Sequence, residues 1–346
     1  MAAQGARAGG AELTAVKRRS AVGLILGAAV LAGTLIYAGA GTVVRTLAGL
    51  HLTGLLIIVL AHVPIVALMG IAWRLAAGTA RTASPRRFMW ARLVRDAAAE
   101  TLPFSQIGGF VLGVRALRLS GPAALRAVLS MSVDLIVELG AKLPYVLAGV
   151  LALLAFAPES GLTRPLAIGL ALTAVAVAAP VLARRRLGDA LDRLIRKISQ
   201  RWPVLASLRQ LNAHGDVNAV LDDILSQRGR LALAFGLHLL CWALGAVEVW
   251  LVLQLLGKPV SAPEALVIDS VVAGLRTFVF MVPAAAGVQE ASYVLACAVF
   301  GISPAAAVAA SLARRARDLT LGAATLAIAA GTDRAIIRGR RETSCR

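Results

Sequence analysis

The sequence predicts an all-α protein that crosses a membrane several times. It further predicts two pseudo-repeated halves, whose broken or re-entrant helices meet near the bilayer midplane. Of the 346 residues, 59% are hydrophobic, and the mean hydropathy of +0.79 is typical of a polytopic membrane protein. Apolar runs of about 20 residues can cross a hydrocarbon core of about 30 Å. We expect such helices at about 21–40, 52–72, 127–157, 165–183, 231–256 and 304–330.

Positive charge gathers between these apolar runs. The formal net charge is +18, from 36 Lys and Arg against 18 Asp and Glu. Because basic loops remain on the cytoplasmic side, we expect both termini in the cytoplasm and no nucleic-acid partner. The same arginines are suited to contact anionic lipid headgroups. The basic segments are 17–19, 74–95, 184–230 and 334–346.

The predicted organisation is a cytoplasmic lead at 1–20, a transmembrane domain at 21–335 and a basic cytoplasmic tail at 336–346. Within the domain, a first half at about 21–183 and a second half at 231–335 flank a cytoplasmic linker at 184–230. Apolar residues at 187–198 of this linker recur with the period of an amphipathic surface helix. These segments and short loops occupy the length, so we expect no soluble catalytic domain and no enzymatic activity.

Two hydrophobic regions, 88–120 and 263–302, are interrupted by proline and glycine. Pro103 and Pro283 break them at similar places, and each region is followed by the triplet Pro-Ala-Ala at the start of a long helix. Hairpins entering from opposite faces and meeting near the midplane would fit this pattern and the loop charges. Two full spans at 265–282 and 284–300 fit the loop charges equally well.

Charged residues inside apolar segments mark the first-half candidates for a substrate site. Asp134, Glu138 and Lys142 follow one another at i, i+4 and share one helix face. Asp134 and Glu138 could line a polar cavity, and a self-neutralising structural ladder is the alternative. Near the first break, Gln106 and Gly108 offer an amide and exposed backbone to a substrate.

The second half offers more charge. Gln289 and Glu290 follow the break at Pro283, where a half-helix would direct its N-terminal amides at an anion. Glu290 could instead only cap that helix. Arg276 could line the cavity from the preceding helix.

Four charges stand within about one turn of the last apolar run. Arg314 and Arg315 can pair with Asp318 at i+4 and i+3, which leaves Arg317 least accounted for. A guanidinium facing a cavity is suited to a phosphate or a carboxylate. Arg314, Arg317 and Asp318 are therefore candidate substrate-binding residues, and an ordinary position near the membrane interface is the alternative.

The sequence indicates no cofactor and no metal. Three cysteines share no metal-binding spacing, and there is no phosphate-binding loop or nucleophile elbow. His62 and His238 are isolated in apolar runs, and Glu248 is a lone carboxylate in another. We interpret the two histidines as core residues, whereas Glu248 could equally be satisfied by a neighbouring helix or take part in the function.

Four segments resemble a known family. The chain is similar to the hopanoid-biosynthesis-associated integral membrane proteins, within the broader flippase-like family named for the membrane region of lysylphosphatidylglycerol synthase. The resemblance extends over about residues 20–335. The segments are 88–96 (FMWARLVRD), 102–109 (LPFSQIGG), 134–138 (DLIVE) and 282–290 (VPAAAGVQE).

This resemblance implies a bacterial inner-membrane protein that moves hopanoids or delivers them towards the outer membrane. The aminoacyl-transferase domain of the synthases has no counterpart here, so movement of a lipid is favoured over its modification. The alternatives are a flippase for an aminoacylated phospholipid or a glycolipid, and a non-catalytic membrane scaffold for lipid biosynthesis. A homo-oligomer is compatible with each of these.

Overall fold

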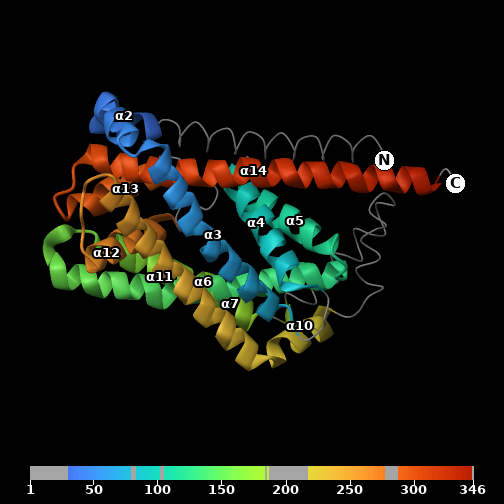
Figure 1. Cartoon of the computed structure of the whole chain (residues 1–346). Coiled ribbons are helices and arrows are strands. Elements are labelled where there is room, and N and C mark those ends of the chain that lie inside the picture. Colours follow the sequence, from blue (N-terminus) through green and yellow to red (C-terminus); the bar gives the residue numbers. More distant parts are fainter. Residues whose placement is uncertain are drawn as a thin grey trace, which may run out of the picture.

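The computed structural model describes residues 30–78, 83–101, 105–183, 185–186, 217–276 and 287–344. Within these ranges the chain is helical and contains no strand (Figure 1). The predicted all-α polytopic membrane fold is therefore confirmed.

Four helices are long and apolar enough to cross a membrane. They match the predicted runs within a few residues at most ends. Helix α11 begins at Arg228, slightly before the predicted start of the second half. The four helices are α3 (His51–Ala76), α6 (Ala124–Phe156), α7 (Thr163–Leu182) and α11 (Arg228–Leu255).

The predicted first span, 21–40, is not a straight helix in its described part. Helix Val30–Ala38 and helix α2 (Ala40–Ala48) meet at an angle of 80°. Gly39 lies at this bend with φ 77°, a backbone conformation that glycine adopts without steric cost. The bent pair counts at most as one broken fifth span.

The last helix, α14 (Pro304–Ser344), is far longer than the predicted run at 304–330. It runs along one side of the molecule in Figure 1, with the C-terminus at its far end. It is not one of the four apolar spans, and its middle carries the charged residues 314–318.

The first broken region forms a helical hairpin. Its arms are α4 (Pro85–Thr101) and α5 (Ser105–Arg118), which lie side by side (Figure 1). At 1.5 Å per residue, 17 and 14 residues extend about 26 and 21 Å, which is less than a hydrocarbon core of about 30 Å. The described part of each arm is therefore shorter than a membrane span.

The second broken region has the same form. Helices α12 (Ala262–Arg276) and α13 (Val288–Ala298) contain 15 and 11 residues, about 22 and 16 Å. Residues 277–286 lie outside the described ones, so the choice between a re-entrant hairpin and two full spans at 265–282 and 284–300 stays a prediction. The breaks themselves, at Pro103 and Pro283, lie outside the described residues.

The two hairpins meet at their tips. Arg276, the last residue of α12, donates a hydrogen bond from Nη2 to Oε1 of Glu100 at 3.1 Å. Glu100 lies one residue before the end of α4. This contact joins the two halves where their chain breaks, as the sequence predicts.

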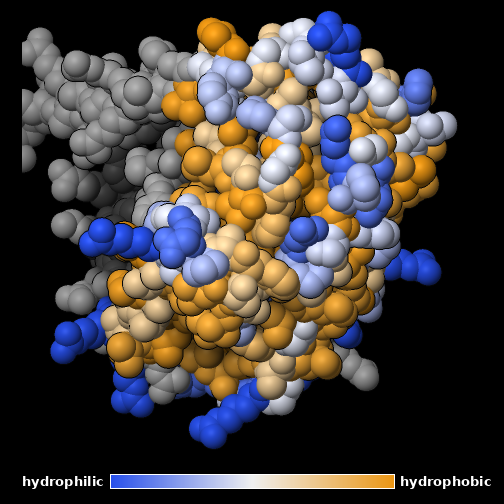
Figure 2. All heavy atoms as spheres, turned by 90° about the vertical axis from the view of Figure 1, so that its left-hand side faces the viewer, coloured by the Kyte–Doolittle hydropathy of each residue, from blue (hydrophilic) through white to orange (hydrophobic). Residues whose placement is uncertain are grey.

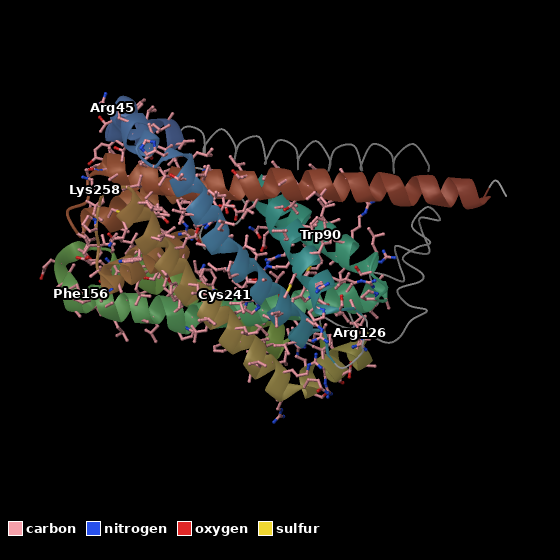
Figure 3. The ribbon with its side chains drawn as sticks, in the orientation of Figure 1. Arg45, Trp90, Arg126, Phe156, Cys241 and Lys258 are labelled. Atoms are coloured by element: carbon pink, nitrogen blue, oxygen red, sulfur yellow. The ribbon has the colours of Figure 1, made fainter. Side chains whose placement is uncertain are left out.

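The ends of the bundle differ in character. A short 3-10 helix, η1 (Pro158–Ser160), follows α6 at the end where Figure 3 shows Phe156 and Lys258. At the opposite end, marked by Arg126 in Figure 3, helix α10 (Val217–Ser226) packs on α6. Arg126 donates a hydrogen bond to Asp223 of α10 at 2.6 Å. The amphipathic pattern at 187–198 lies outside the described residues.

Many large apolar side chains remain exposed along the helices. Leu52, Leu60 and Val175 are 80%, 59% and 63% exposed, as expected for helices that face lipid. Figure 2 views the end that lies on the left in Figure 1, where apolar residues cover much of the surface between separated charged ones. The exposed apolar surface agrees with a protein embedded in a bilayer.

Two adjacent glycines of α5 allow a test of the first hairpin. A Cβ on Gly109 would lie 2.7 Å from the carbonyl oxygen of Arg95, whereas one on Gly108 meets nothing within 4 Å. Gly109→Ala should destabilise the detergent-solubilised protein by about 1–3 kcal/mol, because the arms must separate. Gly108→Ala, the matched control, should be neutral in the same thermal-unfolding assay. Equal melting temperatures for the two variants would contradict this packing.

Candidate functional site

Polar side chains buried between α4, α6 and α11 form one charge cluster, called here the α6 cluster. Helices α4 and α6 contribute its charged groups, and α11 contributes a histidine. Arg92 is only 2% exposed, as is Asp134, so the cluster lies inside the bundle. Its members are Arg92, Arg95, Asp96, Asp134, Glu138 and His238.

Arg92 is the centre of this cluster. Its Nη1 and Nη2 each donate to one oxygen of Glu138 at 3.0 Å, the bidentate geometry that a guanidinium makes with a carboxylate. Its Nε donates to Asp96 at 2.8 Å, and Nη1 also lies 3.4 Å from Asp134. Arg95 adds a second guanidinium, 3.3 Å from Glu138. Three carboxylates thus share two guanidinium groups.

The α11 side of the cluster supplies hydrogen bonds. His238 Nε2 lies 2.9 Å from Oδ1 of Asp134. One turn further, the indole of Trp242 donates to the backbone carbonyl of Glu138 at 3.3 Å. The ammonium group of Lys142 lies 5.5 Å from the centre of the Trp242 ring, within cation–π range. The i, i+4 face of α6 is therefore bound to neighbouring helices, in contrast to a self-neutralising ladder.

Asp134, Glu138 and His238 each place one ligand atom within 4.8 Å of the others, a spacing compatible with a metal ion. However, Arg92 already binds both oxygens of Glu138 and contacts Asp134. A metal ion would have to displace this guanidinium against charge repulsion. We therefore assign these three residues to an ion-pair cluster and do not identify them as metal ligands.

A second cluster, called here the α14 cluster, surrounds the charged turn of α14. It draws carboxylates from α11 and α12, a tyrosine each from α6 and α13, and a histidine from α3. Glu248 and Arg317 are 2% and 4% exposed, so this cluster is also interior. Its members are His62, Tyr145, Glu248, Asp269, Tyr293, Arg314, Arg317 and Asp318.

Arg314 connects α14 to three other helices. Its Nη1 donates to Asp269 of α12 and to the hydroxyl oxygen of Tyr293 of α13, both at 2.7 Å. The hydroxyl of Tyr145 on α6 donates to the other oxygen of Asp269 at 2.6 Å. The i, i+4 pair of Arg314 with Asp318, considered from the sequence, is replaced by these contacts between helices.

Arg317 is not the unpaired guanidinium that the sequence suggested. It donates to Asp318 at 2.7 Å and forms an ion pair with Glu248 of α11. Oε2 of Glu248 also lies 3.1 Å from Nδ1 of His62 and 4.0 Å from Nη2 of Arg314. The lone carboxylate of the α11 sequence is therefore the shared partner of three basic side chains.

Glu290 caps α13 and also forms an ion pair with α14. Its Oε2 accepts the backbone N–H of Gly287 at 2.8 Å, which caps α13, and its Oε1 accepts Nη2 of Arg315 at 2.8 Å. Arg315 therefore pairs with Glu290 and not with Asp318. Gln289 is buried and donates to the hydroxyl of Ser311 at 3.1 Å.

The structure brings half of the predicted site residues into these clusters. Asp134 and Glu138 meet in one, and Arg314, Arg317 and Asp318 in the other. Arg276 lies at the meeting of the hairpins. Gln106 is exposed on α5 and Gly108 faces open space, so neither joins a cluster in this conformation.

The predicted polar cavity is occupied by side chains that contact one another. A surface hollow of about 500 Å³ does occur, between the loop around η1 and the end of α13. It is lined mainly by apolar residues and by none of the predicted site residues. The two clusters and the hairpin contact, called here the polar centre, thus consist of charged side chains that pair with one another.

Sequence reasoning missed several members of the clusters. Arg92 and Arg95 fall in the basic segment 74–95, which we assigned to the cytoplasmic side, but both are buried and paired. The available signal was the alternation of these arginines with apolar residues in 88–96. His62 and His238 are isolated in the sequence, and only the packing of helices gives them carboxylate partners.

Comparison with known families gives one match. The family model described as lysylphosphatidylglycerol synthase TM region matches residues 21–325. The same comparison finds no significant match among curated proteins or among solved structures. The matched range includes both hairpins and both charge clusters.

Proposed function

The chain belongs to the family of the lysylphosphatidylglycerol synthase transmembrane region, and from this premise we propose that it is a flippase-like transporter of whole lipids. The observation that carries the proposal is the pair of charge clusters beside the contact of two helical hairpins. Such charges cost roughly 2.5–3.5 kcal/mol each on insertion scales, so they normally serve a substrate path or a partner in the protein.

The clusters offer a lipid headgroup a replacement for water. A headgroup that crosses hydrocarbon without hydrogen-bond partners loses several kcal/mol for each unsatisfied group. Arginine and carboxylate side chains can exchange their present partners for a headgroup while the apolar tail remains in lipid. The Glu100–Arg276 contact would separate to open this route, since it joins the two hairpin tips.

The transport itself needs no covalent change in the lipid, so the proposed activity is not enzymatic. Asp134, Glu138, Arg276, Glu290, Arg314, Arg317 and Asp318 are the proposed headgroup-contacting residues. Gln106, Gly108 and Gln289 remain candidates for an open conformation. No cofactor takes part in this scheme.

The proposed location is the bacterial inner membrane, with both termini and the basic segments in the cytoplasm. In this orientation the α4–α5 hairpin enters from the cytoplasm and the α12–α13 hairpin from the opposite side. A cysteine introduced at Gly121 should then react with a membrane-impermeant reagent from the cytoplasm alone. Reaction of this cysteine from the periplasm would contradict the orientation.

The resemblance in four sequence segments supports a hopanoid as the transported lipid. Deleting the gene should leave total hopanoid unaltered while depleting it from the outer membrane, as measured by lipid analysis of separated membranes. Loss from both membranes would indicate a role in biosynthesis. No change in either membrane would exclude hopanoids and direct attention to aminoacylated phospholipids or glycolipids.

A further inference from the structure

The side chain of His238 is completely buried, and one of its two ring nitrogens has no hydrogen-bond partner among the described residues. The ionised carboxylate of Asp134 only accepts hydrogen bonds, so the ring proton of neutral His238 lies on Nε2, 2.9 Å from it. Nδ1 then carries a lone pair, and it has no hydrogen-bond partner among the described residues. The side chain is 0% exposed. Nδ1 of this buried ring can therefore accept a proton, while Nε2 stays beside the carboxylate of Asp134.

The polar centre contains one more carboxylate than Lys and Arg side chains, so an added proton would balance its charge. Among the described residues of the two clusters, the hairpin contact and their neighbours, eight carboxylates face seven Lys and Arg side chains. The carboxylates are Asp96, Glu100, Asp134, Glu138, Glu248, Asp269, Glu290 and Asp318, and the cations are Arg92, Arg95, Lys142, Arg276, Arg314, Arg315 and Arg317. One positive charge on a histidine would complete the balance.

We propose that His238 and Asp134 form a proton-binding site that couples lipid movement to a proton gradient. The coupling rests on the proposed transport function, whereas the proton site itself does not. A proton binds Nδ1, and the resulting imidazolium pairs with Asp134 through Nε2–H. The donor is a hydronium ion, whose O–H bond breaks as the N–H bond forms and which leaves as a water molecule.

The groups that face His238 come from the helices packed against α11. Helix α6 presents Asp134 and Glu138, and α4 presents three charges beside them. Helix α3 presents the carbonyl of Ile65, which accepts the thiol of Cys241. The α4 charges are Arg92, Arg95 and Asp96.

The other buried histidine provides an internal comparison. Glu248, which contacts His62, is already paired with Arg317 and lies 4.0 Å from Arg314. An added charge on His62 would face both guanidinium groups. Asp134, in contrast, has one guanidinium contact among the described residues, at 3.4 Å. Of the two histidines, His238 therefore has the carboxylate partner with fewer guanidinium contacts.

Protonation would act on the first hairpin through Arg92. A positively charged imidazolium next to Asp134 offsets the negative charge of this carboxylate. The electrostatic attraction between Asp134 and Arg92 of α4 then becomes weaker. Helix α4 also carries Glu100, whose contact with Arg276 joins the hairpin tips. The protonation state of His238 thus changes the strength of the Arg92–Asp134 contact, which holds α4. Helix α4 is the arm of the first hairpin that we expect to move.

Proton binding can be measured without transport. The chain has four histidines, so selective ¹⁵N-histidine labelling of the full-length protein in nanodiscs gives few ring signals. The signal lost in His238→Gln identifies His238, and it should change when the pH of the sample is lowered over a range of about pH 8 to 5. Asp134→Asn should alter this titration, whereas the His62 signal should stay constant. A His238 signal that is constant over this range overturns the proposal.

Coupling is measured with a fluorescent phospholipid in proteoliposomes. A pH gradient should change the initial rate of lipid movement about fivefold in the wild type and in His51→Gln, which replaces an exposed histidine outside both clusters. His238→Gln can still donate to Asp134 but cannot bind a proton, so the gradient should have no effect. If the wild-type rate of lipid movement does not depend on the gradient, the coupling is overturned but not the transport function. If no tested lipid moves, the transport function is overturned, whereas the NMR test of the proton site remains valid.

Discussion

Glu248→Ala should strongly destabilise the folded protein and lower its melting temperature. Glu248 is 2% exposed and contacts Arg317 and His62, with Arg314 at 4.0 Å. Removing one partner of a buried ion pair costs about 3–5 kcal/mol, because the remaining charges stay buried. This is a large share of the total stability of about 5–15 kcal/mol that native proteins have. Thermal unfolding in detergent, followed by size-exclusion chromatography, measures the loss.

Two further variants test whether the loss of stability comes from the buried ion pair. Glu159→Ala removes an exposed carboxylate from η1 and should leave the melting temperature unchanged. In the double variant Glu248→Leu/Arg317→Met, both charges of one pair are replaced by apolar side chains. It should recover part of the stability, because an apolar pair avoids the desolvation of both charges. A stable Glu248→Ala protein would contradict the buried ion-pair network.

Helix positions were predictable because they depend on local patterns. Apolar runs of spanning length predicted α3, α6, α7 and α11 within a few residues, and proline breaks predicted both hairpins. The angle at Gly39 was missed, since a glycine in an apolar run permits a bend but does not require one.

Charge pairing was less predictable because it depends on tertiary contacts. Spacing along α14 suggested that Arg314 or Arg315 pairs with Asp318. In the fold, Arg314 contacts Asp269 and Arg315 contacts Glu290, because α12 and α13 pack against α14 and bring carboxylates to it. A spacing of four residues identifies possible partners on one helix, but it contains no information on those from other helices.

The structure also changes the expected effect of two substitutions. From the sequence, Glu290→Gln and Arg317→Ala should leave expression and thermal stability nearly unchanged while abolishing lipid delivery. Both side chains are buried and ion-paired, at 0% and 4% exposure. We now expect each variant to be destabilised, so these substitutions alone cannot separate a substrate site from a structural role.

The contact between the hairpin tips is better suited to separate them. Glu100 and Arg276 are 26% and 32% exposed at their side chains, the most accessible pair of the polar centre. An exposed pair contributes little to stability, at most about 1 kcal/mol. Cysteines at both positions, in a chain whose three native cysteines are replaced, should therefore yield folded protein that a short bifunctional thiol reagent can cross-link.

Lipid movement by this cross-linked protein tests the central claim, that a headgroup passes between the two hairpins. The measurement compares the rate of fluorescent lipid movement in proteoliposomes before and after cross-linking, with each single-cysteine variant as the control. We expect movement to stop in the cross-linked double variant and to continue in the controls, because the tips must part to admit a headgroup. An unchanged rate after complete cross-linking would show that lipid does not take this route.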